Sequence, residues 1–174
     1  MTIGEMIKKY DIRDVGDGRI GIYNMKDGKK HMDEIKAKKA EIMAHFAAEK
    51  AAERAAYEAR QAKINAIEGL TELTDAIEAE IAYGNAFNRM MEDEYNDGVN
   101  PPSRPKVSSV ELRKQYPRAA AYIKAENWEY ASHYAKCGAG RRAKERIING
   151  EDYVTVLADM DAEWSAHCAE HMWD

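Results

Sequence analysis

The sequence predicts a mainly α-helical protein with a small N-terminal α-β-β unit, a long helical arm and a C-terminal helical bundle. The 174 residues include only 2 Phe and 4 Pro and are rich in Ala, Glu, Lys and Arg, as in helical soluble proteins. No proline interrupts residues 33–96, whereas three prolines and a glycine between positions 98 and 105 indicate a linker. The expected parts are a docking-like unit at 1–48, the arm at 49–97, the linker at 98–106 and a helical module at 107–174.

The first residues predict a short helix followed by a β-hairpin. Thr2 and Glu5 have the spacing of a capping box, so a helix is expected to begin there. Gly16-Asp17-Gly18 is a tight-turn signal between residues 11–15 and 19–23, which have the composition of two short strands.

One long helix is expected from Asp33, its predicted N-cap, to about Asn96. Its first turns can pack on the hairpin through Ile35, Ile42 and Phe46. Farther along, apolar residues at spacings of three and four indicate a seam that faces a coiled-coil partner, either another chain, such as a second copy, or the C-terminal module. The seam comprises Ile64, Ile67, Leu70, Leu73, Ile77, Ile81, Phe87, Met90 and Met91. Whether the helix is continuous or folds back at Gly69 stays open.

The C-terminal module is expected to consist of short helices. Ser108 and Glu111 have the spacing of a second capping box, and Pro117 suits the first turn of the next helix. Gly138, Gly140 and Asn149-Gly150 are expected to separate the helices that follow.

Charge is sorted into blocks along the chain. Residues 68–97 carry nine acidic side chains and one basic one, and residues 98–150 carry eleven basic and four acidic side chains. Residues 151–174 carry seven acidic side chains and no Lys or Arg. Fields of this strength steer charged partners, which indicates a binding protein, but they do not specify a reaction.

The acidic block supplies the first candidate binding surface. Four carboxylates follow one another on the predicted helix at spacings that resemble a row of phosphates, so they could occupy a positively charged nucleic-acid channel. They are Glu72, Asp75, Glu78 and Glu80. The apolar seam residues Leu73, Ile77 and Ile81 are expected to contact the same partner. The alternative is an ordinary solvated helix face.

The basic block supplies a second candidate surface, for nucleic acid. Cationic side chains interleaved with tyrosines can neutralise phosphates and stack on bases. The candidates are Lys136, Arg141, Arg142, Lys144 and Arg146. The alternative is that these arginines pair with the acidic segment 151–163 of the same module.

Metal binding and catalysis have little support in the sequence. His133 with Cys137, and His167 with His171 beside Cys168, have the i, i+4 spacing of zinc ligands, but the absence of a CxxC knuckle favours core and surface roles. No Gly-rich phosphate loop, HExxH motif or serine nucleophile elbow occurs, so neither an enzymatic activity nor a cofactor is expected. Two cysteines, no signal-peptide pattern and no apolar run of about 20 residues lead us to expect a cytoplasmic protein with no membrane contact.

The N-terminal part resembles a known type of docking domain. Its hairpin and the segment EIKAKKAEIM, residues 34–43, are similar to the small N-terminal docking domains of the TubC type. The resemblance implies a helix-hairpin-helix fold that holds protein partners. The predicted helix continues well past the end of such a domain, so the partner of those domains does not carry over.

The whole chain resembles small proteins of phages and mobile elements in gut Firmicutes. The stretches that carry the resemblance are RMMEDEYNDGVNPP, at 89–102, and the segment from Tyr116 to Tyr153. Among these proteins the chain is similar to type II-A anti-CRISPR proteins. The resemblance implies a non-enzymatic inhibitor in the cytoplasm of a bacterial host cell, which binds Cas9 or the Cas9–guide RNA complex and blocks its DNA binding or cleavage, either with or without direct DNA contact. A docking adaptor that joins protein partners and a small DNA-binding regulator of a mobile element are the alternatives.

Overall fold

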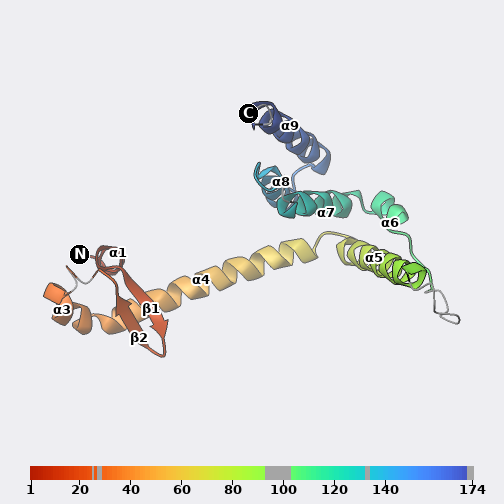
Figure 1. Cartoon of the computed structure of the whole chain (residues 1–174). Coiled ribbons are helices and arrows are strands. Elements are labelled where there is room, and N and C mark those ends of the chain that lie inside the picture. Colours follow the sequence, from red (N-terminus) through yellow and green to blue (C-terminus); the bar gives the residue numbers. More distant parts are fainter. Residues whose placement is uncertain (25, 27–28, 93–102, 132–133, 172–174) are drawn as a thin grey trace. The chain divides into compact units, whose positions relative to one another are not determined.

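The computed structural model describes residues 1–24, 26, 29–92, 103–131 and 134–171 and divides into two units, Met1–Ala59 and Arg60–Asp174 (Figure 1). Both units are dominated by helices, and the N-terminal unit also holds a two-stranded antiparallel sheet. The predicted fold class, mainly α with a small N-terminal α-β-β unit, is therefore confirmed.

The first helix, α1 (Ile3–Tyr10), begins at the predicted capping box. The Glu5 amide donates to Thr2 Oγ1 at 3.2 Å, and the Thr2 amide donates to Glu5 Oε2 at 2.7 Å. These two bonds satisfy amides that a helix start otherwise leaves without a partner. Asp11 then ends the helix in the left-handed region, with φ of 46°.

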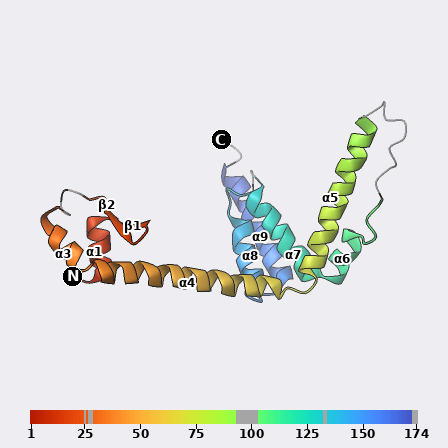
Figure 2. The ribbon, with the colours of Figure 1, turned by 90° about the horizontal axis from the view of Figure 1, so that it is seen from below.

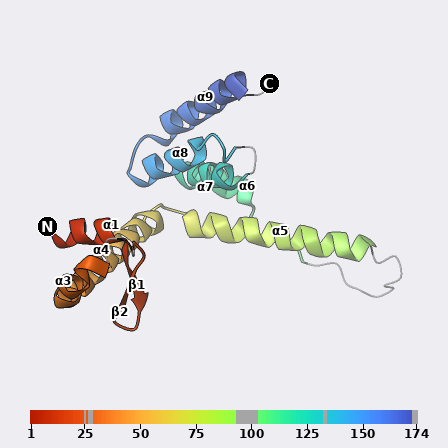
Figure 3. The ribbon, with the colours of Figure 1, turned by 60° about the vertical axis from the view of Figure 1, so that its left-hand side comes forward.

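The hairpin consists of β1 (Ile12–Gly16) and β2 (Arg19–Ile22), close to the predicted strands (Figure 3). Ile12 pairs with Ile22 and Asp14 with Ile20, and a bulge separates Asp14 from Gly16. Asp17 and Gly18 between the strands have φ of 52° and 67°, the left-handed backbone that the glycine-rich turn predicts.

The helix after the hairpin is not continuous. It consists of the 3-10 turn η1 (Lys29–His31), α3 (Met32–Ala37) and α4 (Lys39–Asn65). The prediction that Asp33 caps it is wrong: His31 is the N-cap, without a side-chain bond, and Asp33 lies in the first turn. The predicted packing on the hairpin is correct. Ile35 and Ile42 are buried with Met6, Tyr10 and Ile12, and Ile20, Ile22 and Phe46 pack against them.

The expected long helix also breaks between α4 and α5 (Leu70–Glu92). Gly69 lies at the break with φ of 71°, so of the two possibilities that the sequence leaves open, a continuous helix is excluded. A Cβ on Gly69 would lie 2.1 Å from ring atoms of Tyr116. Both the backbone angle and the approach of Tyr116 therefore require glycine here.

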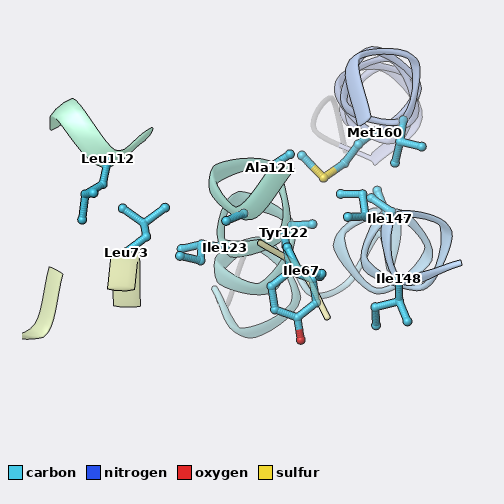
Figure 4. Close-up of a cluster of buried hydrophobic side chains, with 14 of the residues drawn as sticks. Ile67, Leu73, Leu112, Ala121, Tyr122, Ile123, Ile147, Ile148 and Met160 are labelled. Atoms are coloured by element: carbon cyan, nitrogen blue, oxygen red, sulfur yellow. The ribbon is translucent and has the colours of Figure 1, made fainter. Parts of the chain in front are cut away.

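The Arg60–Asp174 unit contains the end of α4, then α5, α6 (Ser109–Gln115), α7 (Pro117–Tyr130), α8 (Ala139–Ile148) and α9 (Tyr153–His171). Figure 2 shows α7, α8 and α9 lying side by side and α5 extending beyond α6. In the core, Ile67 and Leu73 from the start of the unit join Ala121, Ile147 and Met160 (Figure 4). The segment expected as an arm, 49–97, is thus divided, and α5 packs with the C-terminal helices.

Of the predicted helix signals in this unit, Ser108 and Gly140 work differently from expectation. Pro117 does lie at the first position of α7. Ser108 is the N-cap of α6, but its side chain makes no capping bond. Gly140 does not separate helices; it lies inside α8, where a Cβ would lie 2.6 Å from the Ala125 carbonyl oxygen. Its function is to let the α8 backbone approach α7 closely.

Candidate binding surfaces

The apolar seam of α5 is covered only in its first half. Leu73 and Ala76 are buried and Ile77 is packed against the same core, so these residues hold α5 against α6 and α7. Ile81 and Met91 are 58% and 62% exposed. The structure therefore assigns Leu73 and Ile77 to the internal core and leaves Ile81 on the surface.

Three of the four predicted acidic residues, Glu72, Asp75 and Glu78, are exposed on α5. Within the described ranges none of them forms an ion pair. Glu72 accepts a hydrogen bond from the Tyr116 hydroxyl, which raises the pKa of that phenol. Glu72 and Asp75 line a hollow of about 400 Å³, whose other side includes Lys106. This face of α5 keeps its negative charge.

The fourth acidic residue, Glu80, has an internal role. Its Oε1 accepts the Ser109 amide at 2.8 Å and its Oε2 accepts the Ser109 hydroxyl at 2.6 Å. These two bonds lower the pKa of Glu80 below its usual value. Glu80 thus caps α6 from a different helix, which explains why the Ser108 side chain is not needed for capping.

Two of the predicted basic residues pair with the acidic segment that follows them. Arg142 Nε donates to Glu163 Oε2 at 2.9 Å. Arg146 contacts both Glu151, at 2.7 Å, and Asp159, at 2.8 Å. For these arginines the alternative stated above, pairing with residues 151–163, is correct, and α9 provides most of the partners.

Lys144 is not a surface residue. It is 5% exposed, and its Nζ contacts the carboxylates of Glu129 and, at 3.7 Å, Glu126. The same ammonium lies 5.5 Å from the ring centroid of Tyr130. A cation enclosed in this way cannot reach a phosphate, so the structure contradicts its assignment to a nucleic-acid surface.

The other two basic candidates are exposed. Neither Lys136 nor Arg141 forms an ion pair with a described residue. Together with Arg142 and Gly138 they line a pocket of about 540 Å³ at the beginning of α8. Only these two of the five predicted residues therefore offer unpaired positive charge.

The proposed zinc ligands do not assemble in the described ranges. Cys137 Sγ donates to the Glu163 carbonyl oxygen at 3.7 Å. The His167 and His171 rings stack with centroids 4.3 Å apart. Among residues that the structure describes, no three His, Cys, Asp or Glu side chains converge, and His133 lies outside them. The linker residues 98–102 also lie outside the described part.

The sequence interpretation missed a groove in the N-terminal unit. Its volume is about 300 Å³, and it lies between β2 and the helices α3 and α4. Ile20, Ile22, Met32 and Ile35 form an apolar floor, and Arg19, Lys36 and Lys39 provide positive charge. Arg19 comes from β2, Lys36 from α3 and Lys39 from α4, so the fold brings the three cations together.

No helix in the described ranges is long and apolar enough to cross a membrane. The chain matches no family model, no curated protein and no solved structure. The surfaces above, together with the resemblance stated from the sequence, are therefore the basis on which a function is proposed.

Proposed function

We propose that this protein is a non-enzymatic inhibitor that binds a CRISPR effector of the Cas9 type through the acidic face of α5. The observation that carries the proposal is the contrast in pairing: Glu72, Asp75 and Glu78 have no cationic partner in the described chain, whereas Arg142, Lys144 and Arg146 all have carboxylate partners. On this stretch of α5 the charge that remains for a partner is therefore negative.

Such a surface suits a basic partner. Cas9 holds its guide–target heteroduplex in a positively charged channel, which an acidic helix can enter in place of DNA. Exposed Ile81 and Met91 extend from the same helix and supply apolar contact area next to the carboxylates. Occupation of the channel would block DNA binding, and cleavage with it.

The test is a DNA-cleavage assay with a purified Cas9-type effector, loaded with guide RNA or free. Reversal of Glu72, Asp75 and Glu78 to Lys should weaken inhibition at least tenfold, because three attractive contacts become repulsive. The control reverses three exposed carboxylates elsewhere, Glu41, Glu53 and Glu111, and should inhibit like the wild type. Circular dichroism checks that both variants keep their helices.

Two results would contradict the proposal. If the wild-type chain neither binds nor inhibits the effector in either form, the inhibitor function is wrong. If the control loses inhibition as strongly as the α5 variant, overall charge matters and α5 is not the specific surface.

The N-terminal groove supports a second candidate function, a docking adaptor. Its apolar floor and the cations Arg19, Lys36 and Lys39 suit a short acidic and apolar segment of a protein partner. Lys36→Glu with Lys39→Glu should abolish capture of such a partner without affecting effector inhibition. Loss of effector inhibition in this variant would instead place the effector at the groove.

A DNA-binding regulator has less structural support, because only Lys136 and Arg141 of the predicted basic set are unpaired among the described residues. Direct DNA binding whose log affinity falls with log salt concentration with a slope of about two or more would favour the DNA-binding regulator, since each phosphate contact contributes about one unit of slope.

A further inference from the structure

A separate polar pocket of about 360 Å³ lies within the Arg60–Asp174 unit, where the end of α4 and the start of α5 meet α7 and α8. Ile64 and Leu70 form an apolar wall. The polar side chains that line it are Arg60, Gln61, Thr74, Tyr122, Glu126 and Lys144. Apart from Lys144, none of them belongs to a surface discussed above.

Tyr122 supplies a hydroxyl group without a protein partner. The residue is 5% exposed, its ring is part of the core, and its hydroxyl makes no hydrogen bond with a described residue. Figure 4 shows this oxygen at the opposite edge of the cluster from Met160. Burial, with Glu126 nearby, raises the Tyr122 pKa to about 12, so the hydroxyl stays neutral. Because Tyr122 lines the pocket, its hydroxyl can accept a hydrogen bond from a polar group that enters it.

The pocket lining holds two cations, Arg60 and Lys144, and one carboxylate, Glu126. Each cation is bound by a glutamate from outside the lining, so Glu126 is the carboxylate that has no close cation of its own. Arg60 is held by Glu145, with Nε 2.9 Å and Nη2 2.6 Å from Oε1. Lys144 contacts Glu129 and, more distantly, Glu126. Glu126 makes the longest of these contacts, at 3.7 Å, and its side chain is still 39% exposed.

We propose that this pocket binds an arginine side chain presented by a protein partner. The Glu126 carboxylate would pair with the guanidinium, and the Tyr122 oxygen would accept one of its N–H groups. Ile64 and Leu70 can contact the methylene stem, and the exposed Tyr130 ring beside them offers a face for a cation–π contact. A planar fork of donors fits two separated acceptors better than a compact ammonium does.

This inference rests on the proposed function, because a basic effector is a partner rich in arginine. It adds a second contact that is distinct from the acidic face of α5. The pocket and the face lie in one unit, so a single partner could use both.

The pocket can be tested without any effector. The full chain is titrated with N-acetyl-arginine-methylamide and followed by amide and side-chain chemical shifts. N-acetyl-citrulline-methylamide serves as the matched probe, since it has the same shape without the charge. Saturable shifts are expected at Tyr122, Glu126 and Tyr130 with the arginine probe, and binding at least fivefold weaker with citrulline.

Two variants identify the contacts. Glu126→Gln should weaken arginine binding at least fivefold, and Tyr122→Phe about threefold, because each removes one acceptor. Glu111→Gln, an exposed carboxylate on α6, should change nothing. If Glu126→Gln does not fold, Tyr122→Phe still gives the answer, since it removes only a hydroxyl that bonds to no described residue.

The outcomes separate this inference from the proposed function. Equal binding of arginine and citrulline, preferred binding of N-acetyl-glutamate, or unchanged affinity in both variants overturns the arginine pocket. If the pocket binds arginine while the wild-type chain fails to bind the effector, the pocket stands and the effector proposal falls. If the wild type inhibits the effector, but Glu126→Gln changes neither the affinity for the arginine probe nor the inhibition, the effector proposal stands and the arginine pocket falls.

Discussion

Helices α5 and α8 both carry a row of like charges, but the two rows have opposite surroundings. On α8, Arg142 and Arg146 face carboxylates that come mainly from α9, and Lys144 is enclosed between glutamates of α7. On α5, Glu72, Asp75 and Glu78 form no ion pair in the described chain, although Lys106 lies across a hollow from Glu72 and Asp75. The density of charge in a sequence block therefore does not measure the field that a partner meets. The pairing of that charge in the fold decides it.

The largest effect should come from the enclosed cation on α8. Lys144→Met keeps the stem but leaves two glutamates without a counter-charge, which should reduce the free energy of unfolding by about 3 kcal/mol. The measurement is urea unfolding followed by tryptophan fluorescence, because all three Trp lie in the Arg60–Asp174 unit.

Two controls separate charge from packing at Lys144. Lys136→Met, at an exposed residue of the same basic set, should change stability by less than about 0.5 kcal/mol. Adding Glu129→Gln to Lys144→Met should restore part of the lost stability, since it removes one of the unpaired charges. If the double variant is no better than Lys144→Met, the loss comes from packing and the ion-pair account is wrong.

Replacing one glycine in each of the two helices by alanine should give the next largest difference in stability. Gly140→Ala in α8 places a methyl group 2.6 Å from backbone atoms of Ala125 and Glu129, so it should destabilise the protein by about 2 kcal/mol. Gly84→Ala in α5 meets no atom within 4 Å and improves helix propensity, so it should stabilise by roughly 0.5–1 kcal/mol. Opposite signs are the expected result. A destabilising Gly84→Ala would show that the exposed face of α5 is covered in solution.

Much of the fold follows from local chemistry that the sequence displays. The Thr2 capping box, the hairpin turn at residues 16–18 and Pro117 at a helix start each depend on a residue and its immediate neighbours. The sequence does not decide the break at Gly69, where Tyr116 approaches from a distant part of the chain. The residues whose roles the sequence predicts wrongly depend instead on contacts between helices. Glu80 caps α6 only because α5 packs beside it, and Lys144 is buried only because Gly140 lets α8 approach α7.

The same distinction limits what the sequence says about binding sites. From the sequence, pairing of the α8 arginines with residues 151–163 is only an alternative, because Arg142 and Glu163 lie 21 residues apart on different helices and only the fold decides which groups meet. The arginine pocket combines Arg60, Tyr122 and Lys144 from three helices. No periodic pattern along one helix marks such a set.

A smaller effect should distinguish Glu80 from its neighbour Glu78. Its bonds to Ser109 lower the Glu80 pKa below the ordinary value of 4.5, so the unfolded chain takes up a proton more readily than the folded one. The resulting stabilisation is complete above pH 4.5 and is lost as the pH falls through the lowered pKa. At pH 7, Glu80→Gln should lower the melting temperature by a few degrees, and the difference from wild type should shrink on acidification. Glu78→Gln should match the wild type at every pH; a pH-independent deficit in Glu80→Gln would rule out the charge as the cause.

The smallest effect concerns the exposed arginines of α8. The Arg142–Glu163 pair is more than one third exposed on both sides, so Arg142→Gln should reduce stability by no more than about 1 kcal/mol. Arg142 Nη2 also donates to the Cys137 carbonyl oxygen at 3.0 Å, a bond that salt does not screen as it screens an ion pair. Raising the salt concentration should therefore remove only part of the effect. Arg141→Gln, which breaks no ion pair among the described residues, should leave stability unchanged at either salt concentration. Equal losses for the two variants at low salt would mean that pairing with α9 is not what separates the basic row of α8 from the acidic row of α5.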